Sequence, residues 1–542
     1  MNFFSDVKMY WRFAAGLRDF LRHTVSLEEA RAIVRRRMAE RENNFLRLLE
    51  RGIFGYPRSP YLPLLKLAGC EMGDLRNMVR AHGLEGTLGA LRRAGVYVTF
   101  EEFKGKIPIV RNGQTIPVRA RDFDNPYLNH YYSAETGGTT GAGTRIAIDL
   151  DHLAADTPFN MLALDAQGVL NAPKAIWRGV LPDGSGLNYV MRGAKMSRLP
   201  EKWFTPITRE DYKPAVKYRL ATRAIALAGR LSGVPIPRPE PITFREPGAI
   251  ARWARDALLV EGRCLIFCLV SNALRVCVAA QKLGIDLTGA TFEVGGEPPT
   301  ISKANTIAIS GARCYPTYHF GECGRVGMGC ARPVDGNDVH FFKDGLAVIQ
   351  HPRQVPGFDL TVQAFCFTTL LPTVPKLMLN TEIDDYGVIE TRSCGCPLED
   401  YGYSEHIREI RSFRKLTGEG VTLVGSEIEA ILEEILPARF GGSPLDYQLL
   451  EEEDEKGFTK LSLLVSPAVA ITDETAVIRT LLEALGRQNV AGGLTRAIWG
   501  QAKTLRIKRM EPLPTARGKL MPLHLIQRAS GGRPLPPSRE RL

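Results

Sequence analysis

A run of glycine and threonine between Thr136 and Arg145 has the composition of a phosphate-binding loop. Its glycines let the backbone turn several N–H groups toward one point, and its threonine hydroxyls add further donors. Such a nest suits a cluster of anionic oxygens, although the run alone also fits an ordinary surface turn. The Gly-Lys-Ser/Thr ending of the common P-loop is absent. The candidate phosphate contacts are Thr136, Gly137, Gly138, Thr139, Thr140 and Gly141.

Two further candidate segments follow apolar runs that read as buried strands. From residue 249 onward such runs, for example 264–270 and 291–294, alternate with helical patterns. This alternation predicts a parallel sheet covered by helices on both faces. Ligands collect at the carboxyl ends of the strands in such sheets. The segments Gly295-Gly296-Glu297 and Tyr318 to Glu322 are expected at those ends.

The remaining patterns predict the elements that position these segments. A capping box at Ser26 begins a helix to about Arg51, and a strand is expected over residues 96–100. Residues 346–392 predict an antiparallel β subdomain, and the chain after Arg411 predicts a compact α+β unit with a hairpin over 447–465 and a helix over 474–486. The fold class is therefore α/β: a large N-terminal domain of helix-covered sheets with an antiparallel β subdomain, plus a small α+β C-terminal domain.

Composition and charge narrow the class of protein and its compartment. A chain of 542 residues, 44% of them hydrophobic, buries a large core and should hold more than one domain. Ten cysteines are too sparse for a disulfide scaffold, so a cytoplasmic location is expected, and no apolar run is long enough for stable membrane insertion. The net charge of +11 favours polyanionic partners or serves solubility. No recognition motif supports a nucleic-acid partner.

In this order the segments resemble the adenylate-forming superfamily of acyl-CoA synthetases, most nearly its phenylacetate-CoA ligase branch, over about residues 59–523. Residues 136–145 match the family's phosphate loop. Gly295, Gly296 and Glu297 match the turn that lies along the adenine. Tyr318 to Glu322 match a segment in which the tyrosine stacks on adenine and the glutamate binds magnesium.

Three more positions match this family further along the chain. The pair Asp384-Asp385 falls where members keep the aspartate that holds the ribose; the register does not distinguish the two, and Asp385 is favoured. Arg411 matches the arginine at the hinge, and Lys519 matches the catalytic lysine of the C-terminal domain. The chain departs from the pattern at Ala142, where many members have lysine, and at Gly321, where they have threonine.

The resemblance implies an ATP-dependent carboxylic-acid ligase in which Lys519 and Glu322 are catalytic. The acid and MgATP would give an acyl-adenylate, and the acyl group would pass to coenzyme A or to the phosphopantetheine arm of an acyl carrier protein. The domains would be a helical N-terminal segment (1–130), an AMP-binding core (131–410), a mobile lid (411–530) and a disordered tail (531–542). The alternative is a non-catalytic descendant that binds a nucleotide or a partner.

Four residues in the second half predict a metal site. Cys330, His340, Cys394 and Cys396 would give Zn²⁺ three thiolates and one imidazole, a closed tetrahedral site of the structural type. Some phenylacetate-CoA ligases have a similar arrangement in matching segments. The spacing is looser than in a zinc finger, so four buried or free side chains are the alternative.

Two smaller expectations concern the surroundings of the site. The pocket for the acid should lie between the phosphate loop and Gly295, lined by residues near Tyr131, Tyr132 and Phe159. Lys104, in a polar link before the phosphate loop, is interpreted as a solvated surface residue, as is Lys106.

Overall fold

The structure is a computed structural model, and it describes residues 3–135, 138–139, 145–181, 183–206, 216–296, 299, 301–354, 361–412, 415–418, 421–424, 431–442, 446–453, 459–488, 499, 505–513 and 523–525. The chain divides into two compact units. A large unit comprises residues 1–136, 144–355 and 360–413, and a small unit comprises residues 137–143, 356–359 and 414–542.

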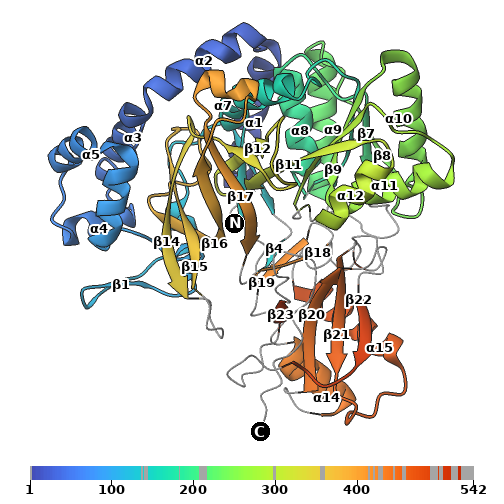
Figure 1. Cartoon of the computed structure of the whole chain (residues 1–542). Coiled ribbons are helices and arrows are strands. Elements are labelled where there is room, and N and C mark those ends of the chain that lie inside the picture. Colours follow the sequence, from blue (N-terminus) through green and yellow to red (C-terminus); the bar gives the residue numbers. More distant parts are fainter. Residues whose placement is uncertain are drawn as a thin grey trace. The chain divides into compact units, whose positions relative to one another are not determined.

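The large unit is built on a twelve-stranded sheet with the order β14-β15-β16-β17-β13-β12-β11-β10-β9-β6-β7-β8 (Figure 1). Its parallel part comprises β6 (Lys174–Trp177), β7 (Lys202–Thr205), β8 (Pro239–Pro241), β9 (Cys264–Leu269), β10 (Ala290–Gly295) and β11 (Arg313–Phe320). Its antiparallel part comprises β12 (Gly324–Gly329), β13 (Val339–Phe341), β14 (Leu346–Gln354), β15 (Thr361–Thr369), β16 (Thr381–Thr391) and β17 (Glu405–Ser412).

The strand order of the parallel part reverses between β6 and β9. From β6 the chain runs outward to β7 and β8, and from β9 it runs the other way to β10 and β11. Because parallel crossovers are right-handed, the connecting helices lie on opposite faces. They are α8 (Ser185–Lys195) and α9 (Val216–Leu231) for one half, and α11 (Val270–Lys282) and α12 (Ile301–Ile309) for the other. The carboxyl ends of β6 and β9 are therefore the switch point at which such sheets bind ligands.

The predicted antiparallel subdomain is confirmed over residues 346–392. β14 pairs with β15 from Leu346↔Thr369 to Gln354↔Thr361, and β15 pairs with β16. Alternate side chains of β15, such as Phe365 and Phe367, are fully buried in the main hydrophobic core. Burial alternates only at the start of β15, and every residue from Ala364 to Thr369 is buried, so this part of the strand is covered on both faces.

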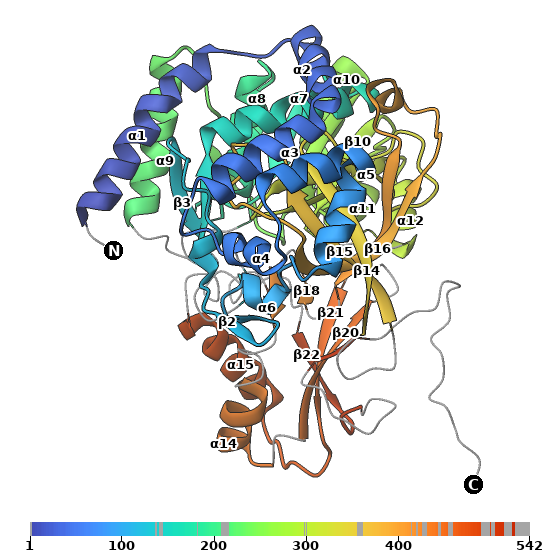
Figure 2. The same ribbon diagram turned by 90° about the vertical axis from the view of Figure 1, so that its left-hand side faces the viewer.

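Helices from the first half of the chain lie over the large sheet (Figure 2). They are α1 (Phe3–Arg22), α2 (Leu27–Ala39), α3 (Arg41–Leu49), α4 (Tyr61–Leu67), α5 (Met72–Arg93), α6 (Phe100–Phe103), α7 (Leu150–Ala166) and α10 (Gly248–Glu261). Two short antiparallel pairs of strands accompany them: β1 (Ile109–Arg111) with β2 (Gln114–Ile116), and β3 (Tyr131–Glu135) with β5 (Arg145–Asp149). The capping box is confirmed, since Ser26 Oγ accepts a hydrogen bond from the N–H of Glu29 at 3.2 Å. The single helix predicted to Arg51 is interrupted at Glu40.

The strand predicted over residues 96–100 is wrong. Val98 makes only one β-bridge, to Thr381, and Phe100 begins helix α6. Thr99 and Glu102 form a capping box at that point, because the hydroxyl accepts from the N–H of Glu102 and the carboxylate accepts from the N–H of Thr99. A helix start therefore replaces the end of the expected strand.

The small unit has a four-stranded sheet with the order β22-β21-β20-β23 and a three-stranded sheet with the order β18-β19-β4. The predicted hairpin is confirmed, since β20 (Tyr447–Glu453) and β21 (Thr459–Val465) are antiparallel. Its other elements are β4 (Gly138–Thr139), β18 (Lys415–Gly418), β19 (Val421–Val424), α14 (Leu436–Phe440), α15 (Glu474–Gln488), β22 (Leu505–Arg509) and β23 (Leu523–Leu525). The α/β class with a smaller α+β unit is confirmed, and the mobility of the lid stays a prediction.

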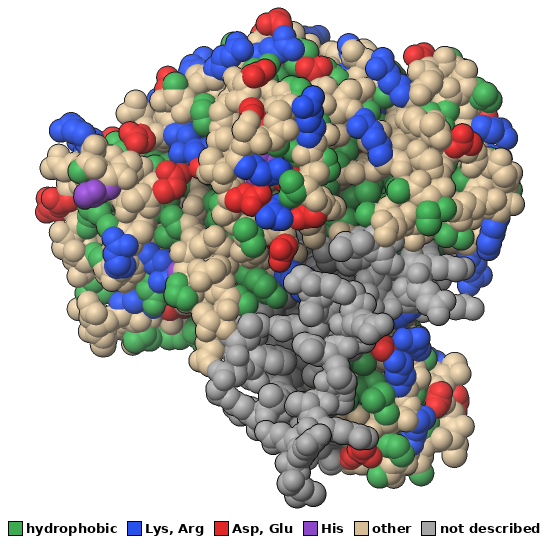
Figure 3. All heavy atoms as spheres, in the orientation of Figure 1, with side chains coloured by type: hydrophobic (Ala, Val, Ile, Leu, Met, Phe, Trp, Pro, Cys, Tyr) green, Lys and Arg blue, Asp and Glu red, His purple; other side chains and the backbone are tan. Residues whose placement is uncertain are grey.

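Charged side chains of both signs are interspersed on the face of the large unit seen in Figure 3. The positive net charge of the chain therefore does not gather into one basic patch on that face, as a nucleic-acid-binding surface would require. Among the described residues, every helix falls short of the length and apolarity that a membrane crossing needs.

Candidate active site and candidate metal centre

Four of the predicted nucleotide-binding residues lie in two pairs of adjoining strands of the large sheet, β10 with β11 and β16 with β17. Gly295 ends β10, which pairs in parallel with β11, the strand that carries Tyr318. The phenol of Tyr318 donates a hydrogen bond to Oδ2 of Asp385 on β16, at 2.8 Å. The next residue of β16, Tyr386, pairs with Arg411 on β17. Residues from four distant parts of the sequence thus form one polar border.

The two neighbouring aspartates on β16 differ in their surroundings. Asp385 accepts the hydrogen bond from Tyr318. Burial, and to a smaller extent the negative charge of Asp385, raise the pKa of Tyr318 well above its ordinary value. Tyr318 is therefore a protonated donor at neutral pH. Asp384 has a φ of +69°, in the left-handed region, and its carboxylate lies 3.7 Å from the guanidinium of Arg353. The assignment of the ribose contact to Asp385 stays a prediction.

Glu322, the predicted magnesium ligand, lies in the turn between β11 and β12. Its carboxylate forms a salt bridge with the ammonium of Lys104 at 2.5 Å, and the two side chains are 10% and 14% exposed. The interpretation of Lys104 as a solvated surface residue is therefore wrong. Lys104 directly follows α6, which ends at Phe103. Its ammonium also lies 5.5 Å from the centroid of the Phe100 ring.

The carboxylate of Glu322 suits Mg²⁺ as a ligand. This ion takes oxygen ligands and is bound in nucleotide sites by one or two carboxylates together with phosphate oxygens. Any cation held there would share the carboxylate with Lys104. Gly296, which follows β10, has a φ of +82°, a backbone conformation that favours glycine. This turn leaves the sheet at the border formed by Tyr318 and Asp385.

Several predicted residues lie wholly or partly outside what the structure describes. In the glycine and threonine run the backbone of Gly138 and Thr139 is described as β4, which pairs in parallel with β19 of the small unit. The remaining predicted contacts Thr136, Gly137, Thr140, Gly141 and Glu297, and the predicted catalytic lysine Lys519, lie outside the described residues.

Two of the residues expected near the acid pocket are part of the hydrophobic core. Phe159 is fully buried, stacked on Phe342 with ring centroids 4.7 Å apart and tilted against Tyr403 at 5.0 Å. Tyr132 is 3% exposed and packs edge-on against Phe13 of α1. Aromatic side chains near a binding loop looked like pocket lining, but packing between helices and sheet uses the same residue types. The packing of these two rings gives the expectation no support, and the lining of the acid pocket stays a prediction.

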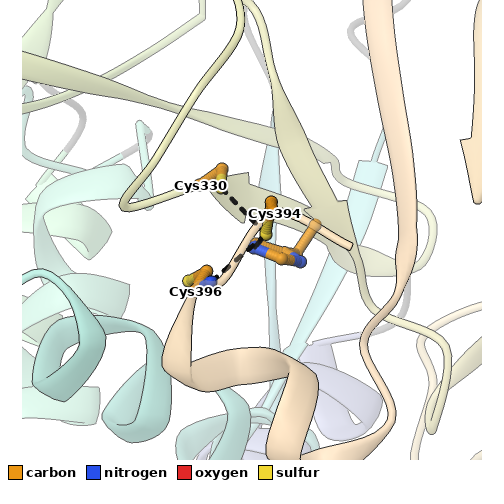
Figure 4. Close-up of side chains that lie close together, drawn as sticks. Cys330, Cys394 and Cys396 are labelled. Atoms are coloured by element: carbon orange, nitrogen blue, oxygen red, sulfur yellow. Dashed lines mark hydrogen bonds between the residues drawn. The ribbon is translucent and has the colours of Figure 1, made fainter. Parts of the chain in front are cut away.

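The four residues of the predicted zinc site converge. One ligand atom of each of Cys330, His340, Cys394 and Cys396 lies within 4.8 Å of the others. Figure 4 shows the three cysteines facing one another from two separate segments of the chain. The sulfurs of Cys330 and Cys394 are 3.5 Å apart, and Nε2 of His340 is 3.7 Å from the sulfur of Cys394. A tetrahedral Zn²⁺ with ordinary bond lengths separates its ligands by about 3.8 Å (S to S) and about 3.6 Å (S to N).

The surroundings of His340 and Cys396 prepare them as metal ligands. His340 is fully buried, and its Nδ1–H donates to the carbonyl of Tyr403 at 2.7 Å, which leaves Nε2 to bind a metal. Hydrogen bonding from Cys330 lowers the pKa of Cys396 and raises that of Cys330, so the first thiolate of the pair forms on Cys396. Cys3His donors with these separations fit a structural zinc ion.

A buried pair next to this cluster escaped sequence reasoning. The ring of His406 lies 4.2 Å from the ring of His340, and His406 Nδ1 hydrogen-bonds the carboxylate of Asp338 at 2.7 Å. Asp338 also forms a salt bridge with Arg392. Cys330, Asp338 and His406 form a second close group of potential ligands. The pairing of β13 with β17 brings the two histidines together, and nothing in the local sequence signals it.

Glu399 organises the turn that carries Cys394 and Cys396. Its carboxylate accepts hydrogen bonds from the N–H of Cys394, from the N–H of Gly395 at 2.8 Å, and from the hydroxyl of Ser393 at 2.9 Å. These hydrogen bonds, chiefly those involving Cys394, lower the pKa of Glu399 to about 2. The backbone of the cysteine turn is thus fixed by one ionised side chain three residues beyond its end.

We expect Glu399→Gln to weaken zinc binding about 10- to 100-fold, the usual effect of removing a group that orients metal ligands. The amide accepts fewer hydrogen bonds and carries no charge, so the turn loses the restraint that keeps the two thiols in place. Competition with a zinc chelator measures the change. Asp400→Asn is the matched control, because Asp400 is exposed on the same short helix. Equal zinc affinity in both variants would contradict the role given to Glu399.

No protein-family model and no curated protein sequence matches the chain. Among solved structures, a 2-hydroxyisobutyryl-CoA ligase in complex with 2-HIB-AMP and CoA is 15% identical, with a TM-score of 0.49 over 94% of this chain and 89% of that one. An amide bond synthetase from Marinactinospora thermotolerans is 13% identical, with a TM-score of 0.39 over 90% and 97% of the two chains. An anthranilate CoA ligase in complex with anthranoyl-AMP is 11% identical, with a TM-score of 0.32 over 85% and 79%.

Proposed function

We propose that the chain is an ATP-dependent carboxylic-acid ligase of the adenylate-forming kind, most similar to phenylacetate-CoA ligases. The observation that supports this proposal best is the hydrogen bond of 2.8 Å between Tyr318 and Asp385, beside the carboxyl end of β10. The family's adenine-stacking and ribose-binding residues would be these two. They are 67 positions apart in the sequence and meet in the structure, as two residues of one nucleotide site would have to.

The proposed chemistry assigns a role to each group in the first half-reaction. The carboxylate of the acid attacks the α-phosphate of ATP, and negative charge grows on phosphate oxygens. The donors of the glycine and threonine run would bind those oxygens, and Glu322 would hold Mg²⁺, which offsets that charge when bound. Lys519 would bring a compact cation to the carboxylate and the α-phosphate. Arg411 would act at the hinge, as in the family.

The second half-reaction would transfer the acyl group from AMP to a thiol. Coenzyme A and the phosphopantetheine arm of a carrier protein are both anionic, and the small unit carries basic side chains on β22, namely Arg506, Lys508 and Arg509. Two of these are already paired with Glu452, since Arg506 lies at 2.7 Å and Lys508 at 2.5 Å from its carboxylate. Arg509 has no carboxylate partner among the described residues, but its guanidinium donates to the carbonyls of Ser466 at 3.1 Å and Val469 at 2.5 Å, so contact with the acceptor would compete with these bonds.

Pyrophosphate release with MgATP across a panel of aromatic and aliphatic acids, without and then with coenzyme A, tests this function. Acid-dependent release is expected, and a requirement for coenzyme A in turnover would identify the acceptor. Release only when an acyl carrier protein is present would identify the carrier instead. The absence of release under all three conditions, in protein that binds ATP, would overturn the proposal in favour of a non-catalytic nucleotide-binding descendant.

The non-catalytic alternative is favoured by Ala142 and Gly321, which remove a charge and a hydroxyl from the phosphate site. Lys519→Ala separates the two functions. A ligase loses adenylation in this variant, whereas a nucleotide-binding protein keeps its ATP affinity and has no adenylation to lose. Lys282→Ala is a suitable control, because Lys282 is an exposed lysine at the end of α11.

A further inference from the structure

Arg178 is the first residue after β6, at the switch point of the large sheet. Its N–H donates to the carbonyl of Phe204 on β7 at 3.1 Å, which fixes its backbone to the sheet. Its guanidinium lies over the ring of Phe267 on β9, 5.1 Å from the centroid. The same ring is stacked on Tyr189 of α8 at 4.3 Å. The arginine is thus on the sheet face that α8 covers.

The guanidinium of Arg178 is buried without a polar partner. The residue is 8% exposed, and its Nε is a buried donor with no hydrogen bond. Within the described part of the chain, no carboxylate forms an ion pair with it and no acceptor takes a hydrogen bond from its side chain. Its guanidinium contacts the ring of Phe267 instead. A buried cation without an anionic partner is costly, because its lost solvation is not offset by an ion pair.

The nearby charges are already balanced among themselves. Arg192 forms a salt bridge with Asp156 at 2.6 Å, and Arg325 lies 3.8 Å from Asp156 and 3.5 Å from Glu293. The second oxygen of Glu293 accepts from two phenols, those of Tyr189 at 3.4 Å and Tyr315 at 3.2 Å. This network contains two arginines and two carboxylates, so it has no negative charge left for Arg178.

The position of Arg178 relates it to the proposed acid site. Trp177 pairs with Cys268, and Cys268 pairs with Val294, so the next row of the sheet contains Arg178 and Gly295. Two strand spacings separate these residues, which is about 10 Å. The acid pocket is expected beside Gly295. A guanidinium at that distance can reach the far end of a short acid whose reacting carboxylate lies at the nucleotide.

We propose that Arg178 binds a second anionic oxygen group, such as a second carboxylate, on the acid that this chain activates. The inference rests on the proposed ligase activity and adds the substrate class to it. Guanidinium and carboxylate form two parallel hydrogen bonds, and the low polarity around Phe267 strengthens them. The substrate would supply the anion that the protein itself does not provide for Arg178.

Pairs of acids that differ only in a second carboxylate test the proposal: hexanoate with adipate, and benzoate with isophthalate. For at least one pair, the wild-type chain should use the diacid with a kcat/KM about 10- to 100-fold higher, the range expected of hydrogen bonds to a charged group. Arg178→Met should reduce this ratio to near one, and Arg178→Lys should keep part of it, because lysine retains the charge but not the bidentate geometry. Equal use of mono- and diacids by the wild type, or an unchanged ratio in Arg178→Met, would overturn the proposal.

Thermal unfolding distinguishes a ligand-binding arginine from a structural one. Replacing an unpaired buried charge by an apolar side chain of similar length should leave Tm unchanged or raise it. Arg192→Met is the matched control on the same face, and it should lower Tm because it removes the closest ion-pair partner of the buried Asp156. A fall in Tm in Arg178→Met as large as in Arg192→Met would overturn the inference.

Calorimetric titration with adipate and isophthalate keeps the test independent of catalysis. Binding that is lost in Arg178→Met supports the anion site even if no acid releases pyrophosphate, in which case the ligase proposal alone fails. Equal binding to the wild type and the variant, or the absence of binding to both, would overturn the site. A variant that loses ATP affinity instead would place Arg178 at the nucleotide and would also overturn it.

Discussion

Glu322→Gln is expected to reduce acid-dependent pyrophosphate release by about 100- to 1000-fold, the effect of removing one electrostatic stabiliser from a transition state in which charge develops. The change removes the anionic oxygen that suits Mg²⁺ and keeps the size of the side chain. It also leaves the ammonium of Lys104, which is 14% exposed, without its carboxylate. The measurement is the initial rate over a titration of Mg²⁺, in which the variant should need more metal and reach a lower plateau.

A double variant that combines Glu322→Gln with Lys104→Met separates the two roles of Glu322. If Glu322 only neutralises Lys104, the double variant should regain both stability and activity, because neither member of the pair is left alone. If Glu322 holds the metal, the double variant should regain Tm but remain as slow as Glu322→Gln. Recovery of pyrophosphate release in the double variant would contradict the metal role. A fully active Glu322→Gln would contradict it directly.

Local patterns in the sequence account well for the sheets and the hairpin. The hairpin of β20 and β21 follows from two apolar runs joined by a polar turn, and the antiparallel part follows from the β-branched and aromatic residues of 346–392. The failure at residues 96–100 has a specific cause. Val98 touches the sheet at Thr381, but the capping box of Thr99 and Glu102 turns the chain into a helix directly afterwards.

Residues of the candidate site are predictable only where a motif surrounds them. The family's pattern predicts Tyr318 and Asp385 as nucleotide-binding residues, although nothing local to either shows that they form a hydrogen bond. Lys104 has no motif and lies 218 positions from Glu322, so its composition-based interpretation as a surface lysine was the natural one. Arg178 follows a strand of four residues, and the sequence does not show that the carboxylates around it are already paired.

The strand pairing also explains why His406 was missed. Cysteines attract attention in a sequence because they are rare and bind metals, whereas a histidine far along the chain resembles any other polar residue. Val339 pairs with Ile407, and this register places His406 against His340. Long-range register depends on the whole sheet, so a reading of local patterns cannot supply it.

Loss of the cysteine turn should have the largest effect on stability. Cys394→Ser with Cys396→Ser removes two of the four donors that lie within 4.8 Å of one another, and elemental analysis should fall from about one zinc per chain to none. Binding to the folded state alone stabilises it by about 4 kcal/mol when free metal exceeds Kd a thousandfold. For a unit of about 400 residues that corresponds to a Tm about 5 °C lower.

The comparison with a chelator decides whether the metal or the thiols produce this effect. A chelator should lower the Tm of the wild type to that of the double variant and leave the double variant unchanged, because both then lack the same ion. Cys314→Ser is the matched control, since Cys314 is half-buried and lies outside the cluster. If the wild type contains no zinc and the chelator has no effect, the four residues are ordinary core side chains. In that case the fall in Tm of the double variant would measure only the cost of placing two hydroxyls among buried sulfurs.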